Sequence, residues 1–156
     1  MVNRLQQFGY RTTVEHARHY IDLQRVGGAS VQEIRSRQLE FQRNVLTMQL
    51  AQEATLDPDE TVFLDRALPD SLAYYRFLDL APDPELLDAL GRASYAKIFI
   101  LDLLPLARDY ARTEDPSAQR RIHELLVEVY GSLAAPIVHV PVLPPDDRVD
   151  FVLTHL

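Results

Sequence analysis

The chain has 156 residues, of which 47% are hydrophobic and 25% charged, the length and balance of one globular domain. Its formal net charge of −7 argues against broad electrostatic binding to nucleic acid or to an anionic membrane. The absence of cysteine excludes a disulfide framework, a zinc–thiolate site and a cysteine nucleophile. No apolar run is long enough to span a bilayer and the first residues form no apolar signal region, so we expect a cytoplasmic protein.

Helix and strand signals alternate through the first part of the chain. Gly9 and the pair Gly27-Gly28 interrupt the apolar spacing, as residues that cap or break helices do. Ser30 followed by Glu33 is a capping-box pattern, which predicts the start of a helix. We expect, in order, a helix over residues 1–9, a short strand over 10–14, a helix over 15–22 and one long helix over about 30–54.

Three short apolar runs in the rest of the chain predict strands over residues 61–64, 97–101 and 137–140. The first of them, TVFL, has no polar alternation, which is typical of a strand buried on both faces of a parallel sheet. Helices are predicted over residues 69–78, 83–91, 115–130 and from 144 onward, with an irregular loop over 102–115. Strands separated by helices predict an α/β fold of three layers around a mainly parallel sheet.

The carboxyl ends of the predicted strands select the candidate site residues, because ligands of open parallel sheets bind beyond those ends. Asp65, followed by Arg66, closes the apolar run at residues 61–64. An acid in this place is typical of a Walker B arrangement, in which the carboxylate holds Mg²⁺ directly or through water. The alternative is that Asp65 caps the turn that follows it, since acids often begin turns.

Two further sets of charged residues are candidates for the same edge. Glu15 and Arg18 lie one helical turn apart, so they could bind a substrate or a phosphate, or form a solvated ion pair. Arg108 and Arg112 lie in the long loop before residue 115. Such a loop could be a lid whose arginines bind the phosphates of a cofactor, or an ordinary solvated loop.

The histidines and the tyrosine pair are weaker signals. His16 and His19 have a spacing that can chelate a metal, but no third ligand lies near them in sequence, so we expect no metal there. His139 lies in an apolar strand and is expected in the core with a satisfied hydrogen bond. Of Tyr74 and Tyr75, one ring should face the core and the other the loops.

Four separated segments resemble a known family. The segment TVFLDRALPDSLAYYRFLDL is similar to the "FLDRG-PDSLAYYR" segment of P-loop NTPases of the AAA-type ATPase group, which includes ribosylnicotinamide-kinase-like domains. Three other segments match the family in the right order, namely VEHARHYI, RTEDPSAQRRIHELLVEVY and VHVPVLPPDDRVDFVL. The resemblance covers essentially the whole chain from Leu5 to Leu156.

The resemblance implies a nucleoside-kinase-like fold that binds ATP and Mg²⁺. It places Asp65 at the end of the Walker B strand as the Mg²⁺-associated acid, and Glu15 near the acceptor substrate as a candidate general base. It also implies that Arg66 and Arg112 face phosphates. Where the family has glycine after the Asp-Arg pair, this chain has Ala67, which would restrict the turn if a positive φ is needed there.

The phosphate-binding loop of the family does not occur in the sequence. Such proteins have a strand followed by a Walker A loop, G-x-x-x-x-G-K-[ST], whose backbone amides and lysine bind phosphates. The only lysine of this chain, Lys97, lies in a predicted strand. We therefore expect a single domain over residues 1–156 that lacks the first, central strand and the P-loop, through a misplaced start codon, a deletion or the choice of expressed segment.

We expect the full-length form to transfer phosphate from ATP to an unidentified small molecule, with activity impaired in this chain. The alternatives are a non-enzymatic interaction or regulatory module that keeps the scaffold, and complementation by another chain. Without a central strand, residues 61–64 and 97–101 would each lack a ladder partner, so we expect a gap, a rearranged pairing or an inserted segment between them. Exposed strand edges would favour self-association.

Overall fold

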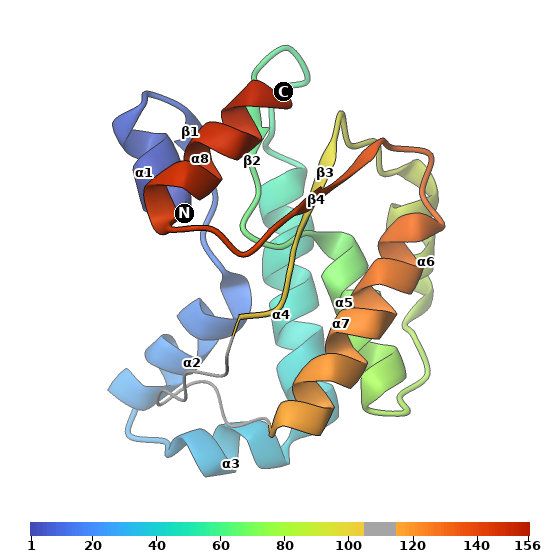
Figure 1. Ribbon diagram of the computed structural model, residues 1–156. Helices are drawn as coiled ribbons and strands as arrows, with labels where there is room; N and C mark the ends of the chain where they lie inside the picture. Colours follow the sequence, from blue (N-terminus) through green and yellow to red (C-terminus); the bar gives the residue numbers. More distant parts are fainter. Residues whose placement is uncertain (105–114) are drawn as a thin grey trace.

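The structure is a computed structural model that describes residues 1–104 and 115–156. In these ranges successive strands are separated by one to three helices (Figure 1). The elements are, in chain order, α1 (Val2–Gln7), β1 (Arg11–Thr12), α2 (His16–Val26), α3 (Val31–Ser36), α4 (Gln38–Glu53), β2 (Val62–Phe63), α5 (Leu68–Phe77), α6 (Pro84–Arg92), β3 (Ile98–Leu101), α7 (Pro116–Gly131), β4 (Ile137–Val140) and α8 (Pro145–Thr154).

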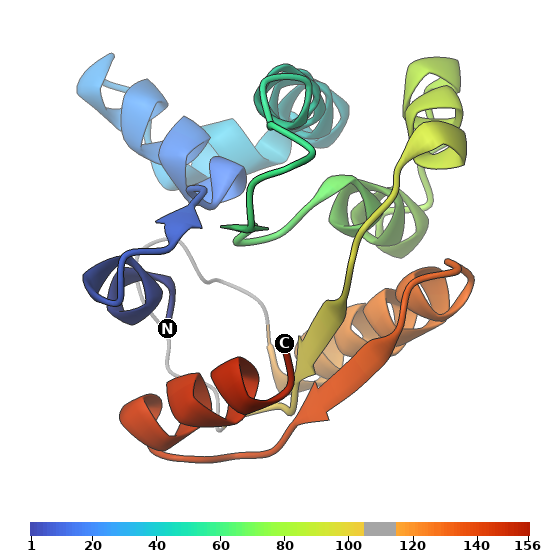
Figure 2. The same ribbon diagram turned by 90° about the horizontal axis from the view of Figure 1, so that it is seen from above.

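The strands form two separate parallel pairs rather than one sheet. β1 pairs with β2, with Arg11 opposite Val62, and β3 pairs with β4, with Ile98 opposite Ile137. Figure 2 shows the two pairs apart, β1 and β2 beside α1, and β3 and β4 beside α7 and α8. The predicted α/β class and parallel pairing are confirmed, but the strands of the described ranges do not form one continuous sheet. The expected gap between residues 61–64 and 97–101 is present among the described residues, since β2 and β3 share no ladder.

The strand β2 is shorter and less buried than the sequence predicts. Val62 and Phe63 are both only half-buried, so the prediction of a strand buried on both faces is wrong. In the described part of the chain β2 pairs on one side only, and its side chains lack the neighbours that a second flanking strand would bring. β3 fits the expectation better, because its alternate residues Ile98 and Ile100 are buried.

The long helix predicted over residues 30–54 is two helices. The capping box at its start is confirmed, with the Ser30 hydroxyl accepting from the Glu33 amide. The helix breaks at Arg37, whose φ of −93° and ψ of 58° are not helical. Just before the break the Ser36 hydroxyl donates to the Glu33 carbonyl, a local bond of the kind that competes with helix continuation. The break lets Ile34 of α3 pack with Phe41 of α4 against α2.

Helix α5 is the centre of the hydrophobic core. Tyr75 and Leu68 pack with Leu86 of α6 on one side of it, together with Leu46 of α4. On its other side Ala73 packs against α7, whose contribution is Leu125 and Val129. The α5 helix begins a few residues after β2, so this packing also anchors the turn between strand and helix, where Asp65 and Arg66 lie.

The helix caps follow the sequence signals. Gly9 ends α1 with a φ of 88°, a backbone conformation that favours glycine. The Asp115 carboxylate accepts from the amides of Ser117 and Ala118, which caps α7 as predicted. None of the helices in the described ranges is both long and apolar enough to cross a lipid bilayer.

Candidate functional site

The carboxyl ends of β1 and β2 bring three sequence-predicted residues together. Because the two strands are parallel and in register, the residues that follow them lie side by side. The Thr13 amide donates to the Phe63 carbonyl at 2.9 Å, and the Asp65 amide donates to the Thr13 hydroxyl at 3.0 Å. These bonds hold the two chain segments together just after the strands end. Glu15 therefore lies next to the Asp65–Arg66 turn.

Arg66 is held by contacts to two side chains. Its Nη2 lies 3.0 Å from Oε1 of Glu15, and its Nη1 donates to the Tyr74 hydroxyl at 3.0 Å. The guanidinium also lies over the Tyr74 ring, 5.4 Å from its centroid. Burial lowers the pKa of Arg66, but Tyr74 and Glu15 raise it by more, so the group stays charged. Arg66 therefore supplies a fixed positive charge at the end of β2.

Glu15 connects two guanidinium groups. Its second oxygen, Oε2, lies 3.6 Å from Nε of Arg18, and the exposed fractions of the two side chains are 20% and 29%. Of the two interpretations of the Glu15–Arg18 pair, the ion pair is present, although it is less solvated than a surface pair. The two guanidinium groups bring positive charge to this edge, where Asp65 adds a second carboxylate beside Glu15.

The carboxylate of Asp65 forms no hydrogen bond or ion pair with the described part of the chain. The interpretation of Asp65 as the cap of the turn is wrong, because the Asp70 carboxylate accepts from the Ala67 amide at 3.0 Å instead. Burial and the neighbouring Glu15 raise the pKa of Asp65, although Arg66 opposes them. A half-buried carboxylate without a side-chain partner in the described ranges is a group that a divalent cation would stabilise in its charged form.

The turn after β2 carries an unusual backbone conformation at Arg66. Its φ is 70°, in the left-handed region that costs a residue other than glycine about 1 kcal/mol. Ala67, which stands where the resembling family has glycine, has an extended φ of −146°. The condition under which Ala67 would restrict the turn is therefore not met, since the positive φ falls one residue earlier.

Several other predicted residues lie away from this site or outside the description. Arg108 and Arg112 lie outside the described residues. His16 is buried and its Nε2 lies 2.5 Å from Oε1 of Gln52, while His19 is exposed. In the described ranges no three His, Cys, Asp or Glu side chains are grouped to hold a metal. The prediction that His139 lies in the core is wrong: its side chain is exposed on β4, where Val140 is the buried residue.

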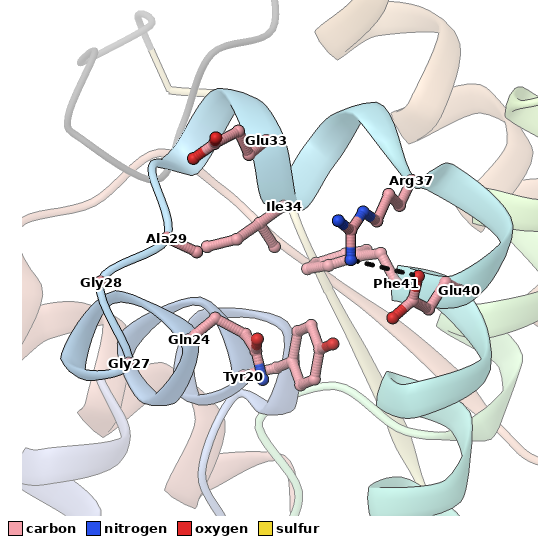
Figure 3. A pocket seen from close by; sticks show the side chains of 10 residues that line it. All are labelled: Tyr20, Gln24, Gly27, Gly28, Ala29, Glu33, Ile34, Arg37, Glu40 and Phe41. Atoms are coloured by element: carbon pink, nitrogen blue, oxygen red, sulfur yellow. Dashed lines mark ion pairs between the residues drawn. The ribbon is translucent and has the colours of Figure 1, made fainter.

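A pocket of about 310 Å³ lies between α2, α3 and α4, apart from the candidate site. Figure 3 shows Tyr20 and Gln24 on one side of it and Arg37 and Glu40 on another, with the Arg37–Glu40 ion pair of 3.8 Å at its edge. Glu15, Asp65 and Arg66 do not line this pocket. The chemistry at the ends of β1 and β2 is thus separate from it.

Replacing Asp65 by asparagine should stabilise the protein at neutral pH. The pKa of Asp65 is raised in the folded state, so ionisation penalises folding as the pH rises through that value. Below the unfolded-state pKa of about 3.9 both states are protonated and the penalty vanishes. We expect Asp65→Asn to raise the free energy of unfolding by about 1 kcal/mol at pH 7, and to change it little near pH 3, in urea titrations at both pH values.

Asp83→Asn is the matched control for this substitution. Hydrogen bonds from Arg43 and Tyr75 lower the pKa of Asp83, so its charged form stabilises the fold. Asp83→Asn should therefore destabilise the protein at pH 7, with the loss shrinking as the pH falls through the lowered pKa. A loss of stability in Asp65→Asn at pH 7 would show that the ionised Asp65 carboxylate has a favourable partner.

Comparison with known proteins identifies the family. No curated protein and no solved structure matches the chain. A protein family described as AAA domain matches residues 1–148, nearly the full length of 156. This agrees with short parallel strand pairs, an acid at the end of β2 and the surrounding helices. The chain belongs to the AAA domain family, a group of P-loop NTPase-type domains.

Proposed function

We propose that this domain binds a nucleoside triphosphate with Mg²⁺ at the carboxyl end of β2, and that its complete form transfers phosphate from ATP to a small molecule. Membership in the AAA domain family supports nucleotide binding. The observation that carries the proposal is the Asp65 carboxylate, which has no partner in the described structure and lies beside the Glu15–Arg66 pair at the end of a parallel strand.

The residues at this edge suit distinct roles. Asp65 would hold Mg²⁺ directly or through water, and the ion would neutralise charge on the nucleotide phosphates. Arg66, which stays charged, would face those phosphates, and Arg108 and Arg112 are proposed as further phosphate ligands. Glu15 is the proposed base for an acceptor hydroxyl. It now pairs with two arginines, so an acceptor must displace at least one of them.

The proposed nucleotide site also needs a phosphate-binding loop. No G-x-x-x-x-G-K-[ST] sequence occurs in the chain, and Nζ of its single lysine, Lys97, donates to the His155 carbonyl. We propose that a fifth parallel strand carrying such a loop fits between β2 and β3, the two strands that share no ladder. This segment would come from residues outside residues 1–156, or from another chain.

Nucleotide binding by the chain alone and by an extended chain tests the proposal. A ligand that binds only the native state raises its stability by RT ln(1 + [L]/Kd). At millimolar ATP and Mg²⁺ we expect almost no rise in Tm for residues 1–156, and a clear rise when a strand and Walker A loop are joined ahead of residue 1. Asp65→Ala in the extended chain should reduce the dependence of the shift on Mg²⁺.

The matched control is the extended chain with the Walker A lysine changed to alanine, which should behave like residues 1–156. Micromolar ATP binding by the unextended chain would contradict the proposal, because the phosphates would then be bound without the loop. Equal nucleotide shifts in the presence and absence of Mg²⁺ would contradict the metal role of Asp65.

The separated strand pairs also favour a second candidate function. β2 and β3 each have one edge without a ladder partner in the described structure, and such edges can accept a strand from another chain. A non-enzymatic interaction module would use those edges and no nucleotide. Self-association that persists in the extended chain, without any ATP-dependent shift, would favour this alternative.

A further inference from the structure

The turn between β2 and α5 must be held in place by its surroundings. Arg66 has a positive φ, which residues other than glycine rarely adopt. In this conformation the Arg66 side chain contacts Glu15.

Side chains from two helices bind three consecutive backbone groups of the turn. The Glu53 carboxylate of α4 accepts from the Leu68 amide at 2.9 Å, and Asp70 accepts from the Ala67 amide at 3.0 Å. The Gln49 amide donates to Oε1 of Glu53 at 2.7 Å and lies 3.5 Å from the Arg66 carbonyl. Gln49 is 3% exposed, so this bonding takes place away from solvent.

Each of the two carboxylates is held in turn by a tyrosine from another part of the chain. The Tyr95 hydroxyl, just before β3, donates to Oε2 of Glu53 at 2.9 Å. The Tyr130 hydroxyl of α7 donates to Oδ2 of Asp70 at 2.5 Å. Burial and the nearby carboxylates raise the pKa of both tyrosines, so they remain hydrogen-bond donors over the whole neutral range. Figure 1 shows α4 and α7 near α5. The two carboxylates accept from the Ala67 and Leu68 amides at the start of α5.

We propose that Glu53 and Asp70, fixed by Tyr95 and Tyr130, are positioning residues for the candidate site: they set the backbone of the Asp65–Arg66 turn and so direct Arg66 to Glu15 and leave the Asp65 carboxylate open. The role of these residues in positioning a nucleotide site rests on the proposed function. Its structural content, the dependence of the turn on these four side chains, can be measured without nucleotide.

The test compares Tyr95→Phe with Tyr75→Phe. Each variant removes one tyrosine hydroxyl that donates to a carboxylate, because Tyr75 donates to Oδ2 of Asp83 at 2.6 Å. In Tyr95→Phe we expect hydrogen exchange at the Leu68 amide, which donates to Glu53, to speed up by about tenfold relative to amides in the middle of α7. The NMR titration of the Asp65 carboxyl should also shift. In Tyr75→Phe the turn amides should change only in step with α7, and the Asp65 titration should stay in place.

Substitutions of Glu53 separate positioning from general stability. Glu53→Gln keeps an oxygen that can accept from the Leu68 amide, so it should retain most of the Leu68 protection, whereas Glu53→Leu should lose it. Uniform changes in exchange across the protein, or an unchanged Asp65 titration in both Tyr95→Phe and Glu53→Leu, would overturn the assignment.

Adding Mg²⁺ and ATP to the extended chain without substitutions tests the proposed function separately, through the NMR signal of the Asp65 carboxyl. A shift of the Asp65 carboxyl signal supports the proposed function. An unmoved signal would count against the proposed function, while the exchange and titration results would still decide whether the four residues hold the turn.

Discussion

Replacing Leu86 by alanine should lower the free energy of unfolding by about 2–5 kcal/mol, a large share of the roughly 5–15 kcal/mol that stabilises a domain. The Leu86 side chain is 0% exposed and packs with Leu68 and Tyr75 of α5. The truncation removes buried methyl groups and leaves a cavity that the surrounding helices can only partly close. Urea denaturation followed by circular dichroism measures the loss.

Leu87→Ala is the matched control, because it makes the same change at the next position of the same helix. Leu87 is 49% exposed, so its truncation should change the free energy of unfolding by no more than about 0.5 kcal/mol. Helix propensity changes equally in the two variants. Similar losses at both positions would contradict the packing of α6 on α5 and with it the anchoring of the turn before α5.

Local signals predicted most elements of the fold. The strand β4 covers Ile137–Val140, the range predicted from its apolar run, and α7 begins at Pro116 after a capping Asp115 as expected. A cap or an apolar run involves neighbours in sequence, so its physical cause is visible in the sequence itself. The same holds for Gly9 at the end of α1.

Features that depend on distant contacts could not be predicted in this way. The break at Arg37 between α3 and α4 contains no glycine or proline that would have indicated it in the sequence. The break allows Ile34 to pack against Ile21 of α2, which is a contact between residues distant in sequence. The burial of β2 was overestimated for a related reason, because an apolar run shows what a strand could bury but not whether neighbouring strands are present.

The residues of the candidate site could be predicted from the sequence more readily than the residues that hold them in place. Parallel strands bring their carboxyl ends to one edge, so a topological rule was sufficient to group Glu15 with Asp65 and Arg66. Glu53 and Tyr95 are 42 residues apart and neither belongs to a local motif, so the sequence offered no signal for their hydrogen bond. The roles of the grouped residues remain predictions that the nucleotide-binding experiments address.

Replacing Arg66 by alanine should lower the free energy of unfolding by about 2 kcal/mol at pH 7, less than for a fully buried pair because the Arg66 side chain is 31% exposed. The substitution removes the ion pair with Glu15 and the hydrogen bond to Tyr74. It also removes the positive charge that lowers the pKa of Asp65, so that pKa should rise further, which NMR titration can measure.

Arg66→Gly and Arg76→Ala separate the contributions to this loss. Glycine removes the same contacts but adopts a φ of 70° without strain, so Arg66→Gly should be more stable than Arg66→Ala by about 1 kcal/mol, less the entropy that glycine gains on unfolding. Arg76 pairs with Glu128 at 2.7 Å, but the two side chains are 43% and 63% exposed, so Arg76→Ala should cost no more than about 0.5 kcal/mol. Equal losses for Arg66→Ala and Arg76→Ala would mean that solvent screens the Arg66–Glu15 pair as fully as a surface pair. The positive charge at the end of β2 would then be too weak to hold a phosphate.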